Sequence, residues 1–137
     1  MCLENAVPAK ADFKVKKYWK TFFLNVFGVR FGVRSVIYGM EYKKGWNYPC
    51  RDEEHISNAG IHCFDNYQDA LNYKNNWGIP NEVICPVYAL GSDILAVGQT
   101  DAEVGFKEFL VPSTTFRKVF IRQKDYEQII KGESVHD

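Results

Sequence analysis

The sequence predicts a single α+β domain, in which two short helices pack on a mostly antiparallel, twisted sheet of about six or seven strands. Short runs of aromatic and β-branched residues recur along the chain between turn residues, which is typical of strands. Only two segments have the apolar spacing of a helix. The 137 residues match one domain, predicted over residues 13–132, between a loose lead-in at 1–12 and a frayed tail at 133–137.

The first two predicted strands form an antiparallel hairpin. Residues 13–25 are aromatic and β-branched with lysines interleaved, which predicts a strand with one solvated face. Residues 29–38 alternate apolar and polar residues up to Ser35, where the alternation breaks and predicts a bulge. The turn of the hairpin is predicted around residues 26–28.

Residues 40–60 are predicted to form a long loop, because they contain glycine, proline and a cluster of charges. Loops of this length in a compact domain are often functional. This one carries the aromatic residues Tyr42, Trp46 and Tyr48. These side chains either pin the loop to the body of the domain or stack on a ligand.

A short buried strand at residues 61–64 leads directly into the first predicted helix. Asp65 or Asn66 is the expected helix cap, and Asp65 with Gln68 three residues later has the pattern of a capping box. The helix is predicted to end before residues 78–80, which contain glycine and proline.

The second half of the chain is predicted to contain further strands and a closing helix. Pro86 places its strand at a sheet edge or at a bulge, because proline donates no ladder hydrogen bond. A polar loop is expected at residues 99–105, and residues 112–114 are expected to separate the last two strands. The predicted strands cover residues 82–90, 94–98, 106–111 and 115–122, and the helix covers 124–131.

The charge balance argues against a nonspecific nucleic-acid binder. Lys plus Arg and Asp plus Glu each number 17, so the formal net charge is zero, whereas such binding needs an excess of positive charge. No apolar run approaches the roughly 18 to 20 residues of a membrane span, and the N-terminus lacks the features of a signal peptide. We therefore expect a cytoplasmic protein with reduced cysteines and no membrane partner.

The cysteines and histidines raise the question of a zinc site. Their spacing, C-x4-H-x6-H-C-x21-C, lacks the close pairs that structural zinc sites use. Phosphate-binding glycine loops and the common hydrolase motifs are also absent from the sequence. The sequence thus predicts neither a metal nor a cofactor. The residues in the zinc pattern are Cys50, His55, His62, Cys63 and Cys85.

His62 is the main candidate functional residue. On a strand it shares a face with Gly60 and Phe64. It is either a core histidine bonded to a backbone carbonyl, or a pocket histidine that binds a polar ligand or transfers a proton. Gly60 leaves space in which a ligand can approach the backbone.

Arg30, Arg34 and Glu108 are further candidates on predicted strands. The two arginines share one face, where they form either a cationic strip for a phosphate or carboxylate or the solvated side of the sheet. Glu108 either is paired in the interior or faces water. The residues predicted to bind a ligand are His62, Arg34, Arg30, Trp46, Tyr48 and Tyr73.

Three motifs follow an opening strand that reads KYWKTFFLN. They are Tyr-Lys-Lys-Gly at 42–45, Gly-Ile-His-Cys-Phe at 60–64 and Ala-Leu-Asn-Tyr at 70–73. In these motifs the chain resembles a loosely defined, functionally uncharacterised group of small proteins from bacteriophages, prophages and large DNA viruses. The resemblance implies an accessory protein in the host-cell cytoplasm, which captures a signal or a host protein.

Two other segments, AGIHCFDNYQDALNYKN and EFLVPSTTFRKVFI, resemble parts of the ADP-ribosyltransferase family. This resemblance implies that His62 stacks on nicotinamide and that Glu108 is the catalytic glutamate. At the family's first motif, His-Gly-Thr or a strand arginine, this chain offers Tyr38-Gly39-Met40, or Arg34 slightly upstream, and the family's Ser-Thr-Ser is absent.

These observations leave three hypotheses for function. The favoured one is binding without catalysis, in which a pocket near His62, covered by Trp46 and Tyr48, captures a nucleotide-like small molecule or a host protein. The second is an NAD-using transferase, which requires His62 and Glu108 to meet in one cleft. The third is a self-associating domain that forms homo-oligomers through its aromatic surface and edge strands.

Overall fold

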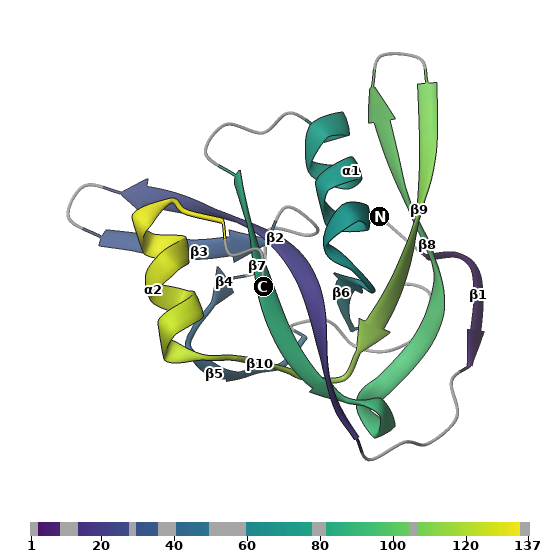
Figure 1. Cartoon of the computed structure of the whole chain (residues 1–137), viewed down its shortest axis with the longest axis horizontal. Coiled ribbons are helices and arrows are strands. Elements are labelled where there is room, and N and C mark those ends of the chain that lie inside the picture. The colour runs from purple at the N-terminus through teal and green to yellow at the C-terminus, as the bar shows by residue number, and fades with distance from the viewer. Residues whose placement is uncertain are drawn as a thin grey trace.

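The computed structural model confirms a single α+β domain with an antiparallel sheet and two helices (Figure 1). It describes residues 3–8, 14–27, 30–35, 41–49, 60–77, 82–104 and 107–134. Among these residues ten strands form one sheet in the order β1-β8-β9-β6-β2-β7-β10-β5, with β3 paired to β2 and β4 paired to β3. The strands are β1 (Leu3–Pro8), β2 (Val15–Phe27), β3 (Arg30–Ser35), β4 (Glu41–Tyr42), β5 (Gly45–Asn47), β6 (Ile61–Phe64), β7 (Glu82–Leu90), β8 (Ile94–Val104), β9 (Lys107–Phe116) and β10 (Val119–Ile121).

The predicted hairpin is confirmed, since β2 pairs with β3 from Phe22↔Ser35 to Phe27↔Arg30. The predicted long loop differs from the structure in its first part, where residues 41–47 form β4 and β5. The side chain of Asn47 closes the turn between these strands, because it accepts a hydrogen bond from Lys43 N at 2.9 Å and donates one to Lys43 O at 2.8 Å.

Three further segments are more regular than the sequence indicates. Residues 3–8, in the predicted lead-in, form β1 and pair with β8. Residues 99–104, in the predicted polar loop, belong to β8. β9 runs through Pro112 without a break, and the chain leaves the strand only after Phe116. Pro112 is opposite Gln99 of β8 and lies just beyond Ser113, the last β9 residue paired with β6, so in the described part of the chain β9 has a strand partner on only one side there.

Helix α1 (Tyr67–Trp77) begins at Asn66 rather than at Asp65. The Asn66 side chain accepts a hydrogen bond from Asp69 N at 2.9 Å and donates one to the Asp69 carboxylate at 3.0 Å, so the reciprocal pair is Asn66–Asp69. Helix α2 (Gln123–Lys131) ends as predicted at Gly132, whose φ of 75° is left-handed. The N–H groups of Gly132 and Glu133 bond to carbonyls of the last helical turn.

Alternation along β2 divides the interior into two cores. Tyr18 and Phe22 belong to a cluster that includes Ile129 of α2, whereas Trp19 belongs to a cluster that includes Tyr73 of α1. The two helices accordingly lie in different places on the sheet (Figure 1). α1 packs against β2, β6, β7, β8 and β9, and α2 packs against β2 and β7. The cluster under α1 and the sheet face that extends from it determine the position of the candidate site.

Candidate ligand-binding site

Three aromatic side chains lie side by side on one face of the sheet. Trp46 of β5 is opposite Phe120 of β10, and Phe120 is opposite Tyr88 of β7. Residues directly opposite one another share a face, so the three form a row across three strands. The rings of Trp46 and Phe120 meet edge to face, with centroids 5.3 Å apart and planes inclined by 70°. We call these three residues the aromatic row.

The aromatic row borders an open groove of about 310 Å³, which Val15, Ala89 and Leu90 complete. Its lining is wholly apolar. Part of this lining faces water, since Val15 is 66% exposed and Trp46 is 38% exposed. Contiguous apolar surface that faces water marks a binding site or an interface more often than a scattered exposed side chain does. The volume is at the lower end of the range for small-molecule pockets, about 300 Å³.

Two cations lie over the rings of the aromatic row. Lys118 Nζ is 4.6 Å from the ring centroid of Trp46, and Arg122 Cζ is 4.6 Å from that of Tyr88. Lys118, Phe120 and Arg122 are alternate residues along β10 and its flanks, so they lie on one side of the chain. Positive charge therefore lies on both flanks of an aromatic surface.

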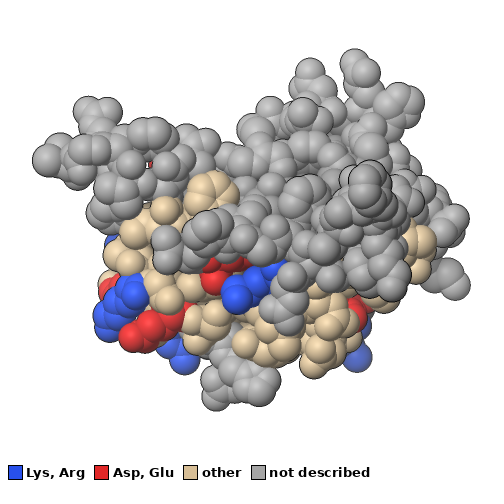
Figure 2. All heavy atoms as spheres, turned by 90° about the horizontal axis from the view of Figure 1, so that it is seen from above, with Lys and Arg blue, Asp and Glu red and all other residues tan. Residues whose placement is uncertain are grey.

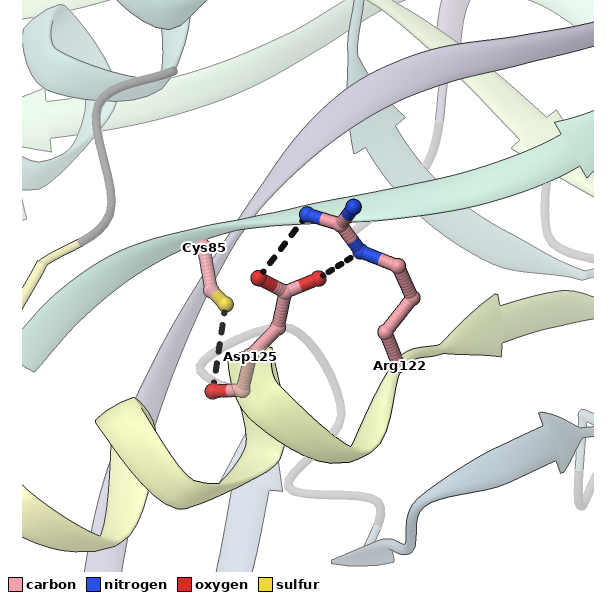
Figure 3. A network of polar contacts seen from close by, with 3 residues as sticks. All are labelled: Cys85, Arg122 and Asp125. Carbon is pink, nitrogen blue, oxygen red and sulfur yellow. Dashed lines mark hydrogen bonds and ion pairs between the residues drawn. The ribbon is translucent and has the colours of Figure 1, made fainter.

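The charge of Arg122 is balanced by Asp125 (Figure 3). Arg122 Nε donates to Asp125 Oδ2 at 2.7 Å, and its Nη2 donates to Oδ1 at 3.2 Å. This pairing with Asp125 raises the pKa of the Arg122 guanidinium. The Cys85 thiol donates to the backbone carbonyl of Asp125 at 3.5 Å, and burial raises the pKa of that thiol. The network anchors the start of α2 to β7.

The groove can bind a flat apolar ring and bring an anion close to a cation. Its lining residues supply stacking and contact surface rather than a nucleophile or a general base. On the face that Figure 2 shows, basic and acidic side chains of the described residues lie next to one another rather than in separate areas.

A second hollow, of about 470 Å³, lies beside the turn between β4 and β5. Tyr48 is 59% exposed there, so the two predicted ligand-binding aromatics of this segment line different depressions. Unlike the groove, this hollow has charged residues in its lining. The residues that line it are Glu41, Tyr42, Lys43, Asn47, Tyr48 and Tyr126.

His62 is 1% exposed, in β6 opposite Thr115 of β9. Burial, with the nearby charge of Lys20, lowers the pKa of His62 to about 3. The imidazole is therefore neutral at physiological pH, which suits a core histidine. The strands β2, β7 and β10 separate β6 from β5 in the sheet, so the structure does not bring His62 and Trp46 together in one pocket.

Gly60, predicted to leave space for a ligand, is closely packed. Its φ is +84°, and a Cβ atom there would lie 2.6 Å from both Leu95 Cδ1 and the carbonyl oxygen of Phe116. The missing side chain is thus required by the approach of β8 and β9 to the start of β6.

Lys20 lies where the sheet divides. One edge of β2 pairs with β7 over residues 15–23, so β6 and β3 share the other edge, with β6 at Trp19 and β3 from Phe22 onward. Between them Lys20, 1% exposed, donates from Nζ to His62 O at 2.5 Å. Burial lowers the pKa of Lys20 to about 8, partly opposed by Cys63.

Lys20 also lies close to Tyr42 and Cys63, which belong to the core cluster that includes Ile129 of α2. Its Nζ is 5.5 Å from the centroid of the Tyr42 ring. Burial raises the pKa of the Cys63 thiol to about 12, and Lys20 opposes that rise. The lysine thus supplies a hydrogen bond to a carbonyl at the point where β6 diverges from β2. Sequence reasoning gave Lys20 no such role.

Glu82 is 5% exposed at the start of β7. It is opposite Phe23 of β2. Burial raises the pKa of its carboxyl to about 7, against the opposing effects of Lys74 and Thr21. This buried acid lies on the α1 side of the sheet, where Thr21 also lies, and not in the groove.

The remaining predicted site residues lie elsewhere. Tyr73 is fully buried on α1, with its ring centroid 5.0 Å from that of Phe64. Arg30 and Arg34 are in β3, opposite Phe27 and Phe23, and their side chains are outside the described part of the chain. Tyr38 is also outside the described residues.

The structure does not bring His62 and Glu108 together along β9. His62 is opposite Thr115, whereas Glu108 is opposite Glu103, near the far end of the β8–β9 hairpin. At about 3.3 Å per residue, the two β9 positions are roughly 23 Å apart. No group of acidic, histidine and cysteine side chains able to hold a metal is present among the residues that the structure describes.

The residues that complete the groove were not predicted from the sequence. Phe120 and Lys118 lie in the predicted strand 115–122, and Tyr88 and Leu90 lie in the predicted strand 82–90. The available signal was alternation, because Lys118, Phe120 and Arg122 occupy every second position. That signal does not reveal that β10 lies between β5 and β7.

A scan of protein-family models, a search of characterised proteins and a search of solved structures each found no match to this chain. Neither α1 nor α2, the helices in the described part of the chain, has the length and apolar composition to cross a membrane.

Proposed function

We propose that this protein binds a nucleotide-like small molecule in the groove, without catalysis. The observation that supports this proposal is the solvent-facing aromatic row with a cation over each outer ring. A nucleotide combines a flat base with an anionic phosphate. Stacking of a base on an aromatic side chain contributes about 1–3 kcal/mol and depends little on which base is present.

The size of the groove and the charge of the chain favour a small ligand over a long polyanion. The formal net charge is zero, whereas the affinity of polynucleotide binders comes largely from many phosphate contacts. A single base with its phosphate needs only one apolar surface and one or two cations. The groove, of about 310 Å³, supplies the apolar surface, and Lys118 and Arg122 lie over two of the rings that line it.

The proposal is tested by titrating AMP, cyclic AMP and NAD into the protein by calorimetry, with Trp46→Ala and Tyr48→Ala as a matched pair. Both residues are exposed aromatics of one segment, but only Trp46 lines the groove. We expect Trp46→Ala to weaken binding of at least one of these compounds by roughly tenfold or more. Tyr48→Ala should bind as the unchanged protein does.

The proposal fails if none of these compounds binds at millimolar concentration, or if Trp46→Ala binds as tightly as the unchanged protein. A melting curve for each variant separates lost binding from lost folding.

A second candidate is self-association through the same surface. β5 is at the end of the strand order, and Trp46 projects from it beside the apolar groove. An edge strand next to exposed apolar surface is suited to pairing with a second copy. Light scattering over a hundredfold dilution tests this candidate. A constant monomer mass rules it out, and a dimer lost in Trp46→Ala supports it.

A further inference from the structure

We infer that Lys118, and not Arg122, holds the anionic group of the ligand, so that the nucleotide binds with its phosphate at the Lys118 end of the groove. This inference rests on the proposed function and specifies the orientation of the ligand in the groove. Both residues carry a cation 4.6 Å from a ring of the aromatic row. The two differ in where they lie relative to the groove and in whether their charge is already paired.

The strand register places the groove on the Lys118 side of the aromatic row. Phe120 is opposite Tyr88 in an antiparallel pair, so position 118 is level with Leu90 and position 122 is level with Pro86. Leu90 lines the groove, as does its partner Val15 on β2, whereas Pro86 does not. The groove therefore opens toward Lys118, and Arg122 lies behind the row.

The electrostatics lead to the same residue. Arg122 makes two hydrogen bonds to Asp125, which is 1% exposed, so most of its charge is already balanced. Lys118 forms no ion pair with a carboxylate in the part of the chain that the structure describes. An unpaired, half-buried ammonium beside an apolar wall attracts an incoming anion more strongly than a guanidinium that is already in a salt bridge.

The wholly apolar lining also restricts where the phosphate and the base of the ligand can lie. A phosphate cannot be desolvated against Val15, Leu90 and Phe120 without a compensating partner, so it must lie at the end of the groove. The base then occupies the apolar part beside the aromatic row. The ligand class is a nucleoside monophosphate, or a larger molecule that presents the same base and phosphate.

The test compares AMP with adenosine in a phosphate-free buffer of low ionic strength. We expect the unchanged protein to bind AMP about fivefold more tightly than adenosine, the upper range for one partly exposed charge pair. In Lys118→Gln the affinity for AMP should fall to that for adenosine, while the affinity for adenosine stays the same. Lys124→Gln, on the exposed side of α2, is the control for net charge and should retain the full preference.

Arg122 is tested with the double variant Arg122→Gln/Asp125→Asn. The single variant would leave the buried Asp125 carboxylate without its partner and would endanger the fold. We expect the double variant to keep the preference for AMP.

The inference is overturned if AMP and adenosine bind equally to the unchanged protein. It is also overturned if Lys118→Gln keeps the preference or if the Arg122 double variant loses it. In each of these cases the proposed function still stands. If neither compound binds, the inference fails, and the proposed function fails with it only if cyclic AMP and NAD do not bind either.

Discussion

Two parts of one sheet face carry the same kinds of side chain but are covered differently. In the first part, Trp19, Ile84 and Phe64 are buried beneath Tyr73 and other residues of α1. In the second part, the same side of the sheet continues into the aromatic row and the groove, where the apolar surface meets water. The two parts differ in what covers them. Helix α1 packs over the first part, whereas the side chains of Lys118 and Arg122 lie over rings of the second part.

The comparison shows which apolar residues serve the fold and which are available for binding. The covered part places Phe64 and Tyr73 in contact, at 1% and 0% exposure. The open part leaves Trp46 at 38% and Val15 at 66% exposure. Apolar area that folding leaves in contact with water can still be buried by a ligand. The two parts should therefore respond oppositely to substitution, one in stability and the other in binding.

The largest expected effect is on core packing. Phe64→Ala should lower the free energy of unfolding by about 3–5 kcal/mol, because it opens a cavity beneath α1. Phe120→Ala, in the open part, should cost only about 1 kcal/mol, because its site is already partly solvated. Urea unfolding of both variants measures the difference. Equal losses would mean that the open part is as important to the fold as the covered part.

The next largest expected difference in stability is between substitutions at two glycines with left-handed backbone, one in each part. Gly60 precedes β6 in the covered part, and Gly45 begins β5 in the open part, with φ values of +84° and +92°. Gly60→Ala should cost about 2–3 kcal/mol or more, because its Cβ would lie 2.6 Å from the carbonyl oxygen of Phe116. Gly45→Ala should cost about 1 kcal/mol, since a Cβ there meets nothing within 4 Å. Similar losses of stability would contradict the packing described at Gly60.

Glu82, in the covered part, should make the stability of the protein depend on pH. Its pKa rises from 4.5 to about 7 on folding. The folded state therefore holds the proton more tightly, and the stability that this supplies below pH 4.5 is lost as the pH rises to about 7. Glu82→Gln removes this loss, so the variant should gain stability relative to the unchanged protein between pH 4 and pH 8, by an amount on the order of 1–2 kcal/mol. A stability difference that does not change with pH would refute the assignment.

The smallest expected effect concerns the cation over Trp46. Lys118→Gln should lower the free energy of unfolding by about 0.5 kcal/mol, the contribution of a partly exposed cation–π contact. Chemical unfolding at 0.05 M and 0.5 M salt measures it, with Lys124→Gln as the control. A loss above about 2 kcal/mol would show that Lys118 supports the fold, and would weaken its role in ligand binding.

The sequence predicted several elements well because each carries a local signal. The strands at 82–90 and 61–64 follow from apolar runs, and the last helix follows from its apolar spacing and its end signal at Gly132. The short strands β4 and β5 have two and three residues, too few to show a period. They form because β3 and β10 supply partners and Asn47 closes the turn between them.

The candidate site was less predictable for a related reason. Trp46 was predicted to bind a ligand from its type and its place in a long segment, and it lines the groove. Its neighbours Phe120 and Tyr88 come from strands far apart in the chain, and only the sheet order brings them together. His62 was singled out by a local motif, which does not record that β8 and β9 close over the start of its strand.

The central claim is that the open part of the sheet, and not the covered part, binds the ligand. The most direct test follows the indole N–H signals of Trp46 and Trp19 by NMR while AMP is added. We predict a saturable shift of the Trp46 signal, with the Trp19 signal unchanged beneath α1. A shift of Trp19 together with residues around His62, while Trp46 stays still, would place the site in the covered part and contradict the claim.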